Sequence, residues 1–124
     1  MPKRYYIKEI ANKFNIPEYL LRYYDEKGVI TKFKRDENDY RYMFEDDLIF
    51  VKTVLCLKKT NMPLKEIIKY IELVDQGEIT LESRQAMILK QEKVVLKKQH
   101  DLEEQIAFIN YKKDFYEQAI KNKK

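Results

Sequence analysis

Three consecutive residues, Arg22, Tyr23 and Tyr24, combine a permanent cation with two phenol hydroxyls just before an acidic pair. A guanidinium pairs with phosphate oxygens and a tyrosine hydroxyl donates to them, so the triplet could bind a polyanion. Successive helical residues point about 100° apart, so all three cannot be core residues of one helix. The plainer alternative, aromatic core residues beside a surface arginine, stays open.

A second group of cations follows within ten residues and is interleaved with aromatic residues. Basic side chains of this kind can contact the phosphates or the minor groove of a nucleic acid. Lysines that protect the edge of a solvated hairpin would give the same pattern. The group comprises Lys32, Lys34, Arg35 and Arg41 beside Tyr40 and Tyr42.

Cys56 is the single cysteine of the chain and its one strong nucleophile. On a helix it would lie at the edge of the core, near Ile49 and Lys52. Lys52 and Lys59, at i−4 and i+3, could favour the thiolate that reacts with electrophiles. A lone cysteine is more often a small core residue, and this alternative also stays open.

The sequence offers few residues for disulfide, metal or catalytic chemistry. One cysteine excludes an internal disulfide, and with one histidine, His100, a zinc or iron site is not expected. We find no Ser-His-Asp set and no glycine-rich phosphate loop. The sequence therefore predicts no enzyme, no metal and no cofactor.

The elements that must position these residues begin with two short helices. Apolar spacing in "YIKEIANKF" predicts one helix, and Pro17 suits the first turn of the next. Because about three residues join them, they form a helix-turn-helix candidate. Gly28 ends the second helix. The β-favouring residues that follow flank the turn cluster "DEND" and predict a β-hairpin wing, comprising Val29, Ile30, Phe33, Tyr40 and Tyr42.

Two further helices complete the first domain. "FEDDLIFVKTVLCLKKTN" has acids in its first turn and lysines in its last, which suits the helix dipole. Its expected core stripe is Leu48, Val51, Val54 and Leu55. A fourth helix begins at Pro63 and ends before Gly77, so we expect the first domain to span residues 1–76.

Residues 77–124 predict one long helix, with no glycine or proline from Thr80 to Ile120. An apolar residue recurs every seven positions, and a helix of about 60 Å cannot bury such a stripe alone. The second row of helix positions that would face a partner is polar in its middle, which is too weak for a free-standing zipper. We therefore expect an antiparallel or crossed pair of chains. The predicted dimerisation residues are Ile88, Val95, Leu102, Ile109 and Tyr116.

Composition adds broad limits. The chain has 124 residues and a net charge of +4, and its first 60 residues carry 13 Lys/Arg against 10 Asp/Glu. A modest basic excess beside the helix-turn-helix favours a nucleic-acid partner. No apolar run is long enough to span a membrane, and the start lacks the apolar core of a signal peptide. We therefore expect a cytoplasmic protein.

The order of elements and several motifs resemble the MerR family of bacterial transcription regulators. The motifs are "YIKEIANKFNIPEYLLRYYDEKGVI", "YRY", "DL" and "MPLKEI". The resemblance implies a mainly α fold, with a winged helix-turn-helix head and a long dimerisation helix. It implies a nucleoid-associated homodimer that binds promoter DNA, distorts its spacer and acts on RNA polymerase indirectly. A coiled-coil adaptor that binds no DNA is the alternative.

The resemblance also implies roles for individual residues. It implies DNA contacts by Arg22, Tyr23, Tyr24, Arg41 and Lys58. Tyr19 could reach a base edge, and Lys34 and Arg35 belong to the wing. Arg41 is the strongest wing candidate, with Tyr40 packed beneath it. The segments "ITLESR", "INYKKDFYEQA" and "CLKKTNMPL" resemble the branch that senses aldehydes or nitrosative stress through a cysteine at the position of Cys56.

This chain departs from the family pattern at three positions that are usually glycine. They hold Asn15, Asp39 and Asn61. Asparagine and aspartate tolerate left-handed backbone better than other side chains, so we expect these turns to survive. Leu20 replaces the usual threonine of the second helix, which could alter DNA contacts without altering the fold.

Overall fold

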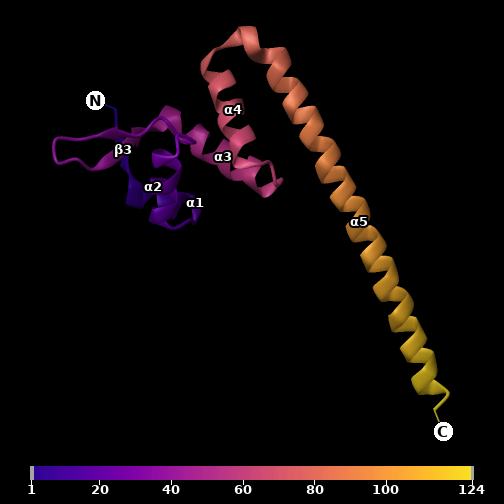
Figure 1. Cartoon of the computed structure of the whole chain (residues 1–124). Helices are drawn as coiled ribbons and strands as arrows, with labels where there is room; N and C mark the ends of the chain where they lie inside the picture. Colours follow the sequence, from indigo (N-terminus) through magenta and orange to yellow (C-terminus); the bar gives the residue numbers. More distant parts are fainter. Residues whose placement is uncertain (1, 124) are drawn as a thin grey trace. The chain divides into compact units, whose positions relative to one another are not determined.

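Helices α1 (Ile7–Phe14) and α2 (Glu18–Glu26) are the first two helices of the computed structural model, which describes residues 2–123 (Figure 1). The three-residue turn between them agrees with the prediction. Asn15 ends α1 in left-handed backbone at φ 55°, and the Ile16 N–H donates to the Ala11 carbonyl at 3.0 Å. The turn thus reverses the chain without a glycine.

The other two substituted glycine positions behave in the same way. Asp39 and Asn61 both have φ of 67°, so the expectation of left-handed turns is confirmed at all three positions. Gly28 and Gly77 also have positive φ, at 72° and 84°. These two glycines fall at the ends of α2 and of the fourth helix, where the sequence predicted boundaries.

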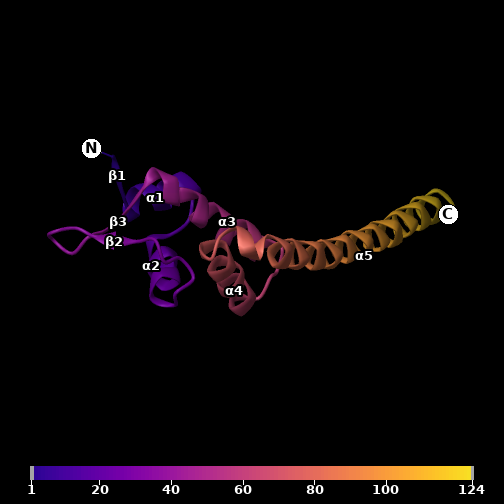
Figure 2. The same ribbon diagram turned by 90° about the horizontal axis from the view of Figure 1, so that it is seen from above.

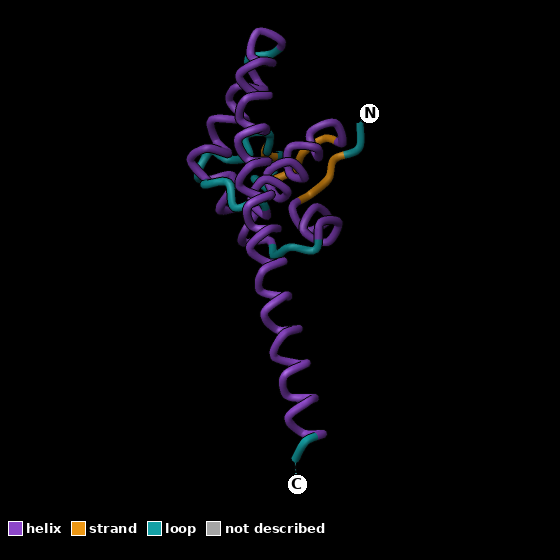
Figure 3. The backbone as a smooth tube through the Cα atoms, turned by 90° about the vertical axis from the view of Figure 1, so that its right-hand side faces the viewer, coloured by secondary structure: helices purple, strands orange, loops and turns teal. Residues whose placement is uncertain are grey.

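A small antiparallel sheet forms the wing and its root. Its strands are β1 (Arg4–Tyr6), β2 (Lys34–Arg35) and β3 (Arg41–Phe44), in the order β1-β3-β2. The β2–β3 loop projects from the helices in Figure 2, and the strands are orange in Figure 3. Strand β1 was not predicted, because three residues show no period and only pairing with β3 defines them.

Val29 and Ile30 do not belong to the hairpin as predicted. Both are fully buried outside the strands, and their N–H groups donate to the Tyr24 carbonyl at 2.9 and 3.2 Å. These bonds close the end of α2 and direct both side chains into the core. Their β-favouring character reflected burial rather than strand pairing.

Helices α3 (Leu48–Lys59) and α4 (Leu64–Asp75) complete the head. The acids expected in the first turn of α3 instead form a 3₁₀ turn, η1 (Glu45–Asp47), that precedes it. Leu48, Val51 and Val54 are buried as predicted, whereas Leu55 is half-buried and Leu57 occupies the core instead. A second 3₁₀ turn, η2 (Glu78–Thr80), follows α4.

One hydrophobic core joins these helices, the sheet and the segment after α2. Among residues 2–123, Met43 is the one strand residue that is fully buried. The fully buried side chains are Ile10, Leu21, Val29, Ile30, Met43, Val51, Val54, Met62 and Ile67.

Helix α5 (Leu81–Lys121) is one unbroken helix of 41 residues (Figure 3), which confirms the predicted long helix, although it begins after η2 rather than at residue 77. Chain contacts divide the molecule into two units, Met1–Met87 and Ile88–Lys124. The first unit extends beyond residue 76, where the sequence predicted the domain boundary. Hydrogen bonds from the side chains of Thr80 and Arg84 to the Leu73 and Gly77 carbonyls join the start of α5 to this unit. No helix within residues 2–123 is long and apolar enough to cross a membrane.

Candidate nucleic-acid interface

Helix α2 has one exposed polar face and one buried face. Tyr19, Arg22 and Tyr23 follow the i, i+3, i+4 spacing of one helical face, and all three are exposed. Leu21 and Tyr24 share the opposite face and lie in the core. The Arg22 guanidinium lies 3.7 Å from the Glu18 carboxylate, an exposed pair that an incoming anion could replace.

Tyr24, unlike Arg22 and Tyr23, is buried. Only 3% of it is exposed, although the sequence predicted a DNA contact for all three residues of the triplet. Burial raises the pKa of the Tyr24 hydroxyl, and the nearby Tyr23 raises it further. The reason is geometric, because Tyr24 lies three residues after the core residue Leu21. In this structure its ring packs in the core beside Tyr23, with centroids 5.9 Å apart.

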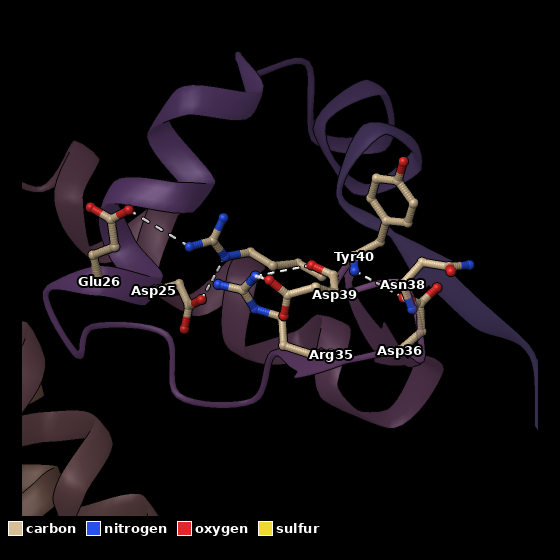
Figure 4. Close-up of polar contacts among 8 residues, drawn as sticks. Asp25, Glu26, Arg35, Asp36, Asn38, Asp39 and Tyr40 are labelled. Atoms are coloured by element: carbon tan, nitrogen blue, oxygen red, sulfur yellow. Dashed lines mark hydrogen bonds and ion pairs between the residues drawn. The ribbon is translucent and has the colours of Figure 1, made fainter.

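The wing presents Lys34 and Arg35 on β2, both exposed as predicted. Asp36 organises the loop that follows (Figure 4). Its carboxylate accepts from the Tyr40 N–H at 2.8 Å and the Asn38 N–H at 2.9 Å. These bonds to the charged form, the first above all, lower the pKa of Asp36. The loop is therefore held by an ionised aspartate.

Arg35 is anchored to the other side of the same loop. Its guanidinium donates to the Asp39 carbonyl at 3.0 Å and lies 3.3 Å from the Asp39 carboxylate (Figure 4). Tyr40 is 65% exposed and its ring points away from the aspartates in the same view. The expectation that Tyr40 packs beneath Arg41 is therefore wrong. Tyr40 is an exposed aromatic residue that the sequence reasoning missed as a contact candidate.

Arg41, the strongest wing candidate for a DNA contact, is instead paired with two carboxylates of its own chain. Its Nε donates to the Asp25 carboxylate at 2.8 Å, and its Nη2 lies 3.6 Å from the Glu26 carboxylate. Its side chain is only 14% exposed. The charged pair after the triplet thus binds the root of the wing to the end of α2, a role that spacing alone did not indicate.

Lys58, in the last turn of α3, is exposed and lies beside α2. It borders a groove of about 460 Å³ between α2, α3 and the turn after α1. The groove wall includes Leu20 and Tyr24 from α2, and Leu55 and Lys59 from α3. The structure therefore brings Lys58 next to α2, as a shared DNA-facing role would require.

Cys56 is a free thiol on the exposed side of α3. The sequence placed it at the edge of the core, but that edge is occupied by the half-buried Leu55. Lys52, one turn earlier, and Lys59 are exposed on the same helix. Within this one chain the thiol is open to reagents.

The five predicted dimerisation residues all lie on the exposed surface of α5. Ile88, Val95, Leu102, Ile109 and Tyr116 are between 39% and 57% exposed. The neighbouring row behaves likewise, with Phe108 and Phe115 also exposed. Within the described part of Ile88–Lys124, Gln91 is the one buried residue. The apolar stripe of α5 is thus unsatisfied by its own segment. No cluster of metal-ligating side chains occurs among residues 2–123.

Comparison with known proteins identifies the family. Residues 5–73 match the sequence model described as the MerR HTH family regulatory protein. A relative from Haemophilus influenzae, described as an uncharacterised HTH-type transcriptional regulator, is 33% identical over 115 residues. That alignment covers 93% of this chain and 85% of the relative.

Solved structures agree over nearly the whole chain. HiNmlR, described as a MerR family regulator lacking the sensor domain and bound to promoter DNA, has a TM-score of 0.82 and 32% identity. The match covers 97% of this chain and 95% of HiNmlR. A MerR family transcriptional regulator from Bacillus thuringiensis has a TM-score of 0.81 and 30% identity, over 92% of this chain and all of that one. The chain therefore belongs to the MerR family of helix-turn-helix regulatory proteins.

Proposed function

We propose that this protein is a transcriptional regulator that binds promoter DNA as a homodimer in the cytoplasm, on the nucleoid. The observation that carries the proposal is the exposed face of α2, where Tyr19, Arg22 and Tyr23 stand together. An arginine and two phenols on one face of an exposed helix suit the floor and walls of a major groove. The DNA-bound state of HiNmlR, similar over 97% of this chain, supports the assignment.

The proposal assigns DNA contacts to those predicted residues that are exposed in the free chain. In the proposed complex α2 enters the major groove, with Arg22 and Tyr23 on phosphates and Tyr19 toward a base edge. Lys34 and Arg35 of the wing and Lys58 of α3 bind flanking phosphates. Arg41 and Tyr24 instead hold α2 in place, Arg41 through Asp25 and Tyr24 through the core.

The proposed dimer forms through α5. Exposed apolar side chains recur along this helix at heptad spacing, and a second copy would cover them. A two-fold dimer binds a two-fold operator, with one head on each half-site. Distortion of the DNA between half-sites costs several kcal/mol and can align promoter elements for RNA polymerase. The protein would act on the polymerase through the shape of the DNA.

Cys56 is the proposed signal input. Its exposure allows an electrophile to reach the sulfur, and Lys52 and Lys59 supply positive charge on the same helix. With an aldehyde, the thiolate adds to the carbonyl carbon and the carbonyl oxygen takes a proton from water, giving a hemithioacetal. The added group would change the packing around α3 and so the binding of DNA.

DNA binding is tested with a footprint on the DNA upstream of the protein's gene. We expect a two-fold protected region with an exposed, distorted centre. Arg22→Ala should weaken binding by about 1–3 kcal/mol and reduce the dependence on salt by about one phosphate contact. Lys65→Ala, at an exposed position of α4, is the control and should bind like wild type. If Arg22→Ala binds equally well, the interface is misplaced and the adaptor alternative gains support.

The thiol switch is tested on the same DNA with and without formaldehyde. Wild type should change its footprint at the centre of the site, and Cys56→Ser should not. A response that persists in Cys56→Ser would show that the signal enters elsewhere. No response in either protein would leave Cys56 as a surface residue without a signalling role.

A further inference from the structure

A hydrogen-bond network joins the end of α4 to the start of α5. Thr80, in η2, is 6% exposed, and its hydroxyl lies 2.5 Å from the Leu73 carbonyl and 2.8 Å from the Gly77 carbonyl. The same hydroxyl accepts from Nε of Arg84 at 3.0 Å. Figure 1 shows the turn in which these residues lie, between α4 and α5.

The network adds side-chain partners to two backbone carbonyls, one in the last turn of α4 and one just after it. Leu73 is in the last turn of α4, and its carbonyl accepts from the Gln76 N–H at 3.1 Å in addition to lying beside the Thr80 hydroxyl. The Gly77 carbonyl accepts from the Thr80 N–H at 3.0 Å and from Nη2 of Arg84 at 3.1 Å. The Arg84 cation also lies next to the negative end of the α4 dipole, which favours it there.

The backbone at Gly77 makes this joint specific. Its φ of 84° and ψ of −157° fall in a region that essentially only glycine adopts. A Cβ at Gly77 would meet no atom within 4 Å, so the backbone conformation rather than space requires glycine. The chain therefore makes one defined turn here, and Thr80 and Arg84 hold it from the α5 side.

We infer that Thr80 and Arg84 are positioning residues that fix the direction in which α5 leaves the head, and so set which half-site separation the dimer binds. This inference rests on the proposed function. A change of about 10° in the direction of a helix about 60 Å long would move its far end by about 10 Å, close to three base-pair steps. The residues would thus determine DNA specificity without touching DNA.

The first experiment measures the joint in the full chain without DNA. Spin labels at Lys65→Cys and Lys90→Cys, in a Cys56→Ser background diluted with unlabelled chain, report the distance between α4 and α5. Thr80→Ser keeps the hydroxyl and should retain a narrow distance distribution. Thr80→Val keeps the shape but removes the hydroxyl, and should broaden or shift it. Arg84→Gln should do the same, and Arg84→Lys should do so partly.

The second experiment reads specificity from a random duplex library selected by each protein. Wild type and Thr80→Ser should favour one half-site separation roughly tenfold over its neighbours, as expected when the wrong spacing must deform DNA. Thr80→Val and Arg84→Gln should select a shifted or mixed set of separations. All four proteins should bind an isolated half-site equally, because the head is unchanged.

The outcomes separate the inference from the proposed function. If Thr80→Val retains the wild-type distances and separation, the inference is overturned. Equal changes in Thr80→Ser and Thr80→Val would also overturn it, because the hydroxyl would not be the cause. If wild type selects no two-fold site, the proposed function fails and the spacing role falls with it, while the distances still show whether the network holds the joint.

Discussion

The head buries its apolar residues, whereas the segment beyond Met87 exposes them. The head encloses Leu21, Val51 and Ile67 completely, whereas the segment leaves Leu102 and Ile109 more than half exposed. Both regions have helical spacing that the sequence displays clearly. The difference teaches that one chain suffices to bury the apolar residues of the head, whereas one chain leaves those of α5 exposed, as the proposed dimer requires.

The test with the largest expected effect removes a core side chain from the head. Leu21→Ala should lower the free energy of unfolding by about 2–5 kcal/mol, because it leaves a cavity at a fully buried position. Urea unfolding measures it. Leu96→Ala, the same change at an exposed position of α5 outside the predicted rows, should cost under about 0.5 kcal/mol. Similar losses at both sites would contradict the division into enclosed head and open helix.

The next test acts on the exposed apolar stripe of α5. Leu102→Glu places a charge in the predicted seam and should raise the dimer dissociation constant by about 100-fold, which is about 2.7 kcal/mol. Analytical ultracentrifugation measures the constant, and circular dichroism of the head should stay unchanged. Leu96→Glu is the matched control off the seam and should dimerise normally. Equal weakening by both variants would show that the seam is assigned wrongly.

A smaller effect is expected at the turn between α1 and α2. Asn15→Ala should destabilise the head by about 1–2 kcal/mol, because alanine resists the left-handed φ of 55°. Asn15→Gly should be as stable as wild type or nearly so, and urea unfolding compares the two. An alanine variant as stable as the glycine variant would show that the turn does not constrain the head.

The smallest effect is local to the wing and depends on pH. The folded pKa of Asp36 is lowered, so its contribution is complete above the ordinary aspartate value of about 3.9 and is lost as pH falls through the folded pKa. The protection of the Tyr40 and Asn38 amides against hydrogen exchange, relative to the intrinsic rate at each pH, should fall in that range. In Asp36→Ala, which removes the acceptor, both amides should be unprotected at every pH. A wing that stays protected in acid would show that other bonds hold it.

Much of the fold followed from periodicity and from residues suited to special backbone. The helix bounds near Phe14, Pro63 and Gly77 and the length of α5 came from these signals. The three left-handed turns followed from residue type at positions that the family resemblance supplied. Strand β1 did not, because its pairing with β3 links residues some 40 positions apart.

The sequence predicted the kinds of residue in the candidate site better than it predicted the role of each residue. The exposed face with Tyr19, Arg22 and Tyr23 follows from helical spacing once the core face is known. Sequence could not show that Arg41 is taken by Asp25, because an ion pair between distant segments leaves no periodic signal. It also left open which residue of the triplet belongs to the core, and the structure buries Tyr24 there.

The ion pair between Arg41 and Asp25 has a consequence for the kinetics of recognition. Because it joins the root of the wing to the end of α2, the two elements proposed to contact DNA are already ordered relative to each other in the free head. Their loss of conformational entropy then occurs during folding rather than during binding. A head preorganised in this way needs no slow rearrangement after encounter, so it can sample many wrong sites quickly and leave them.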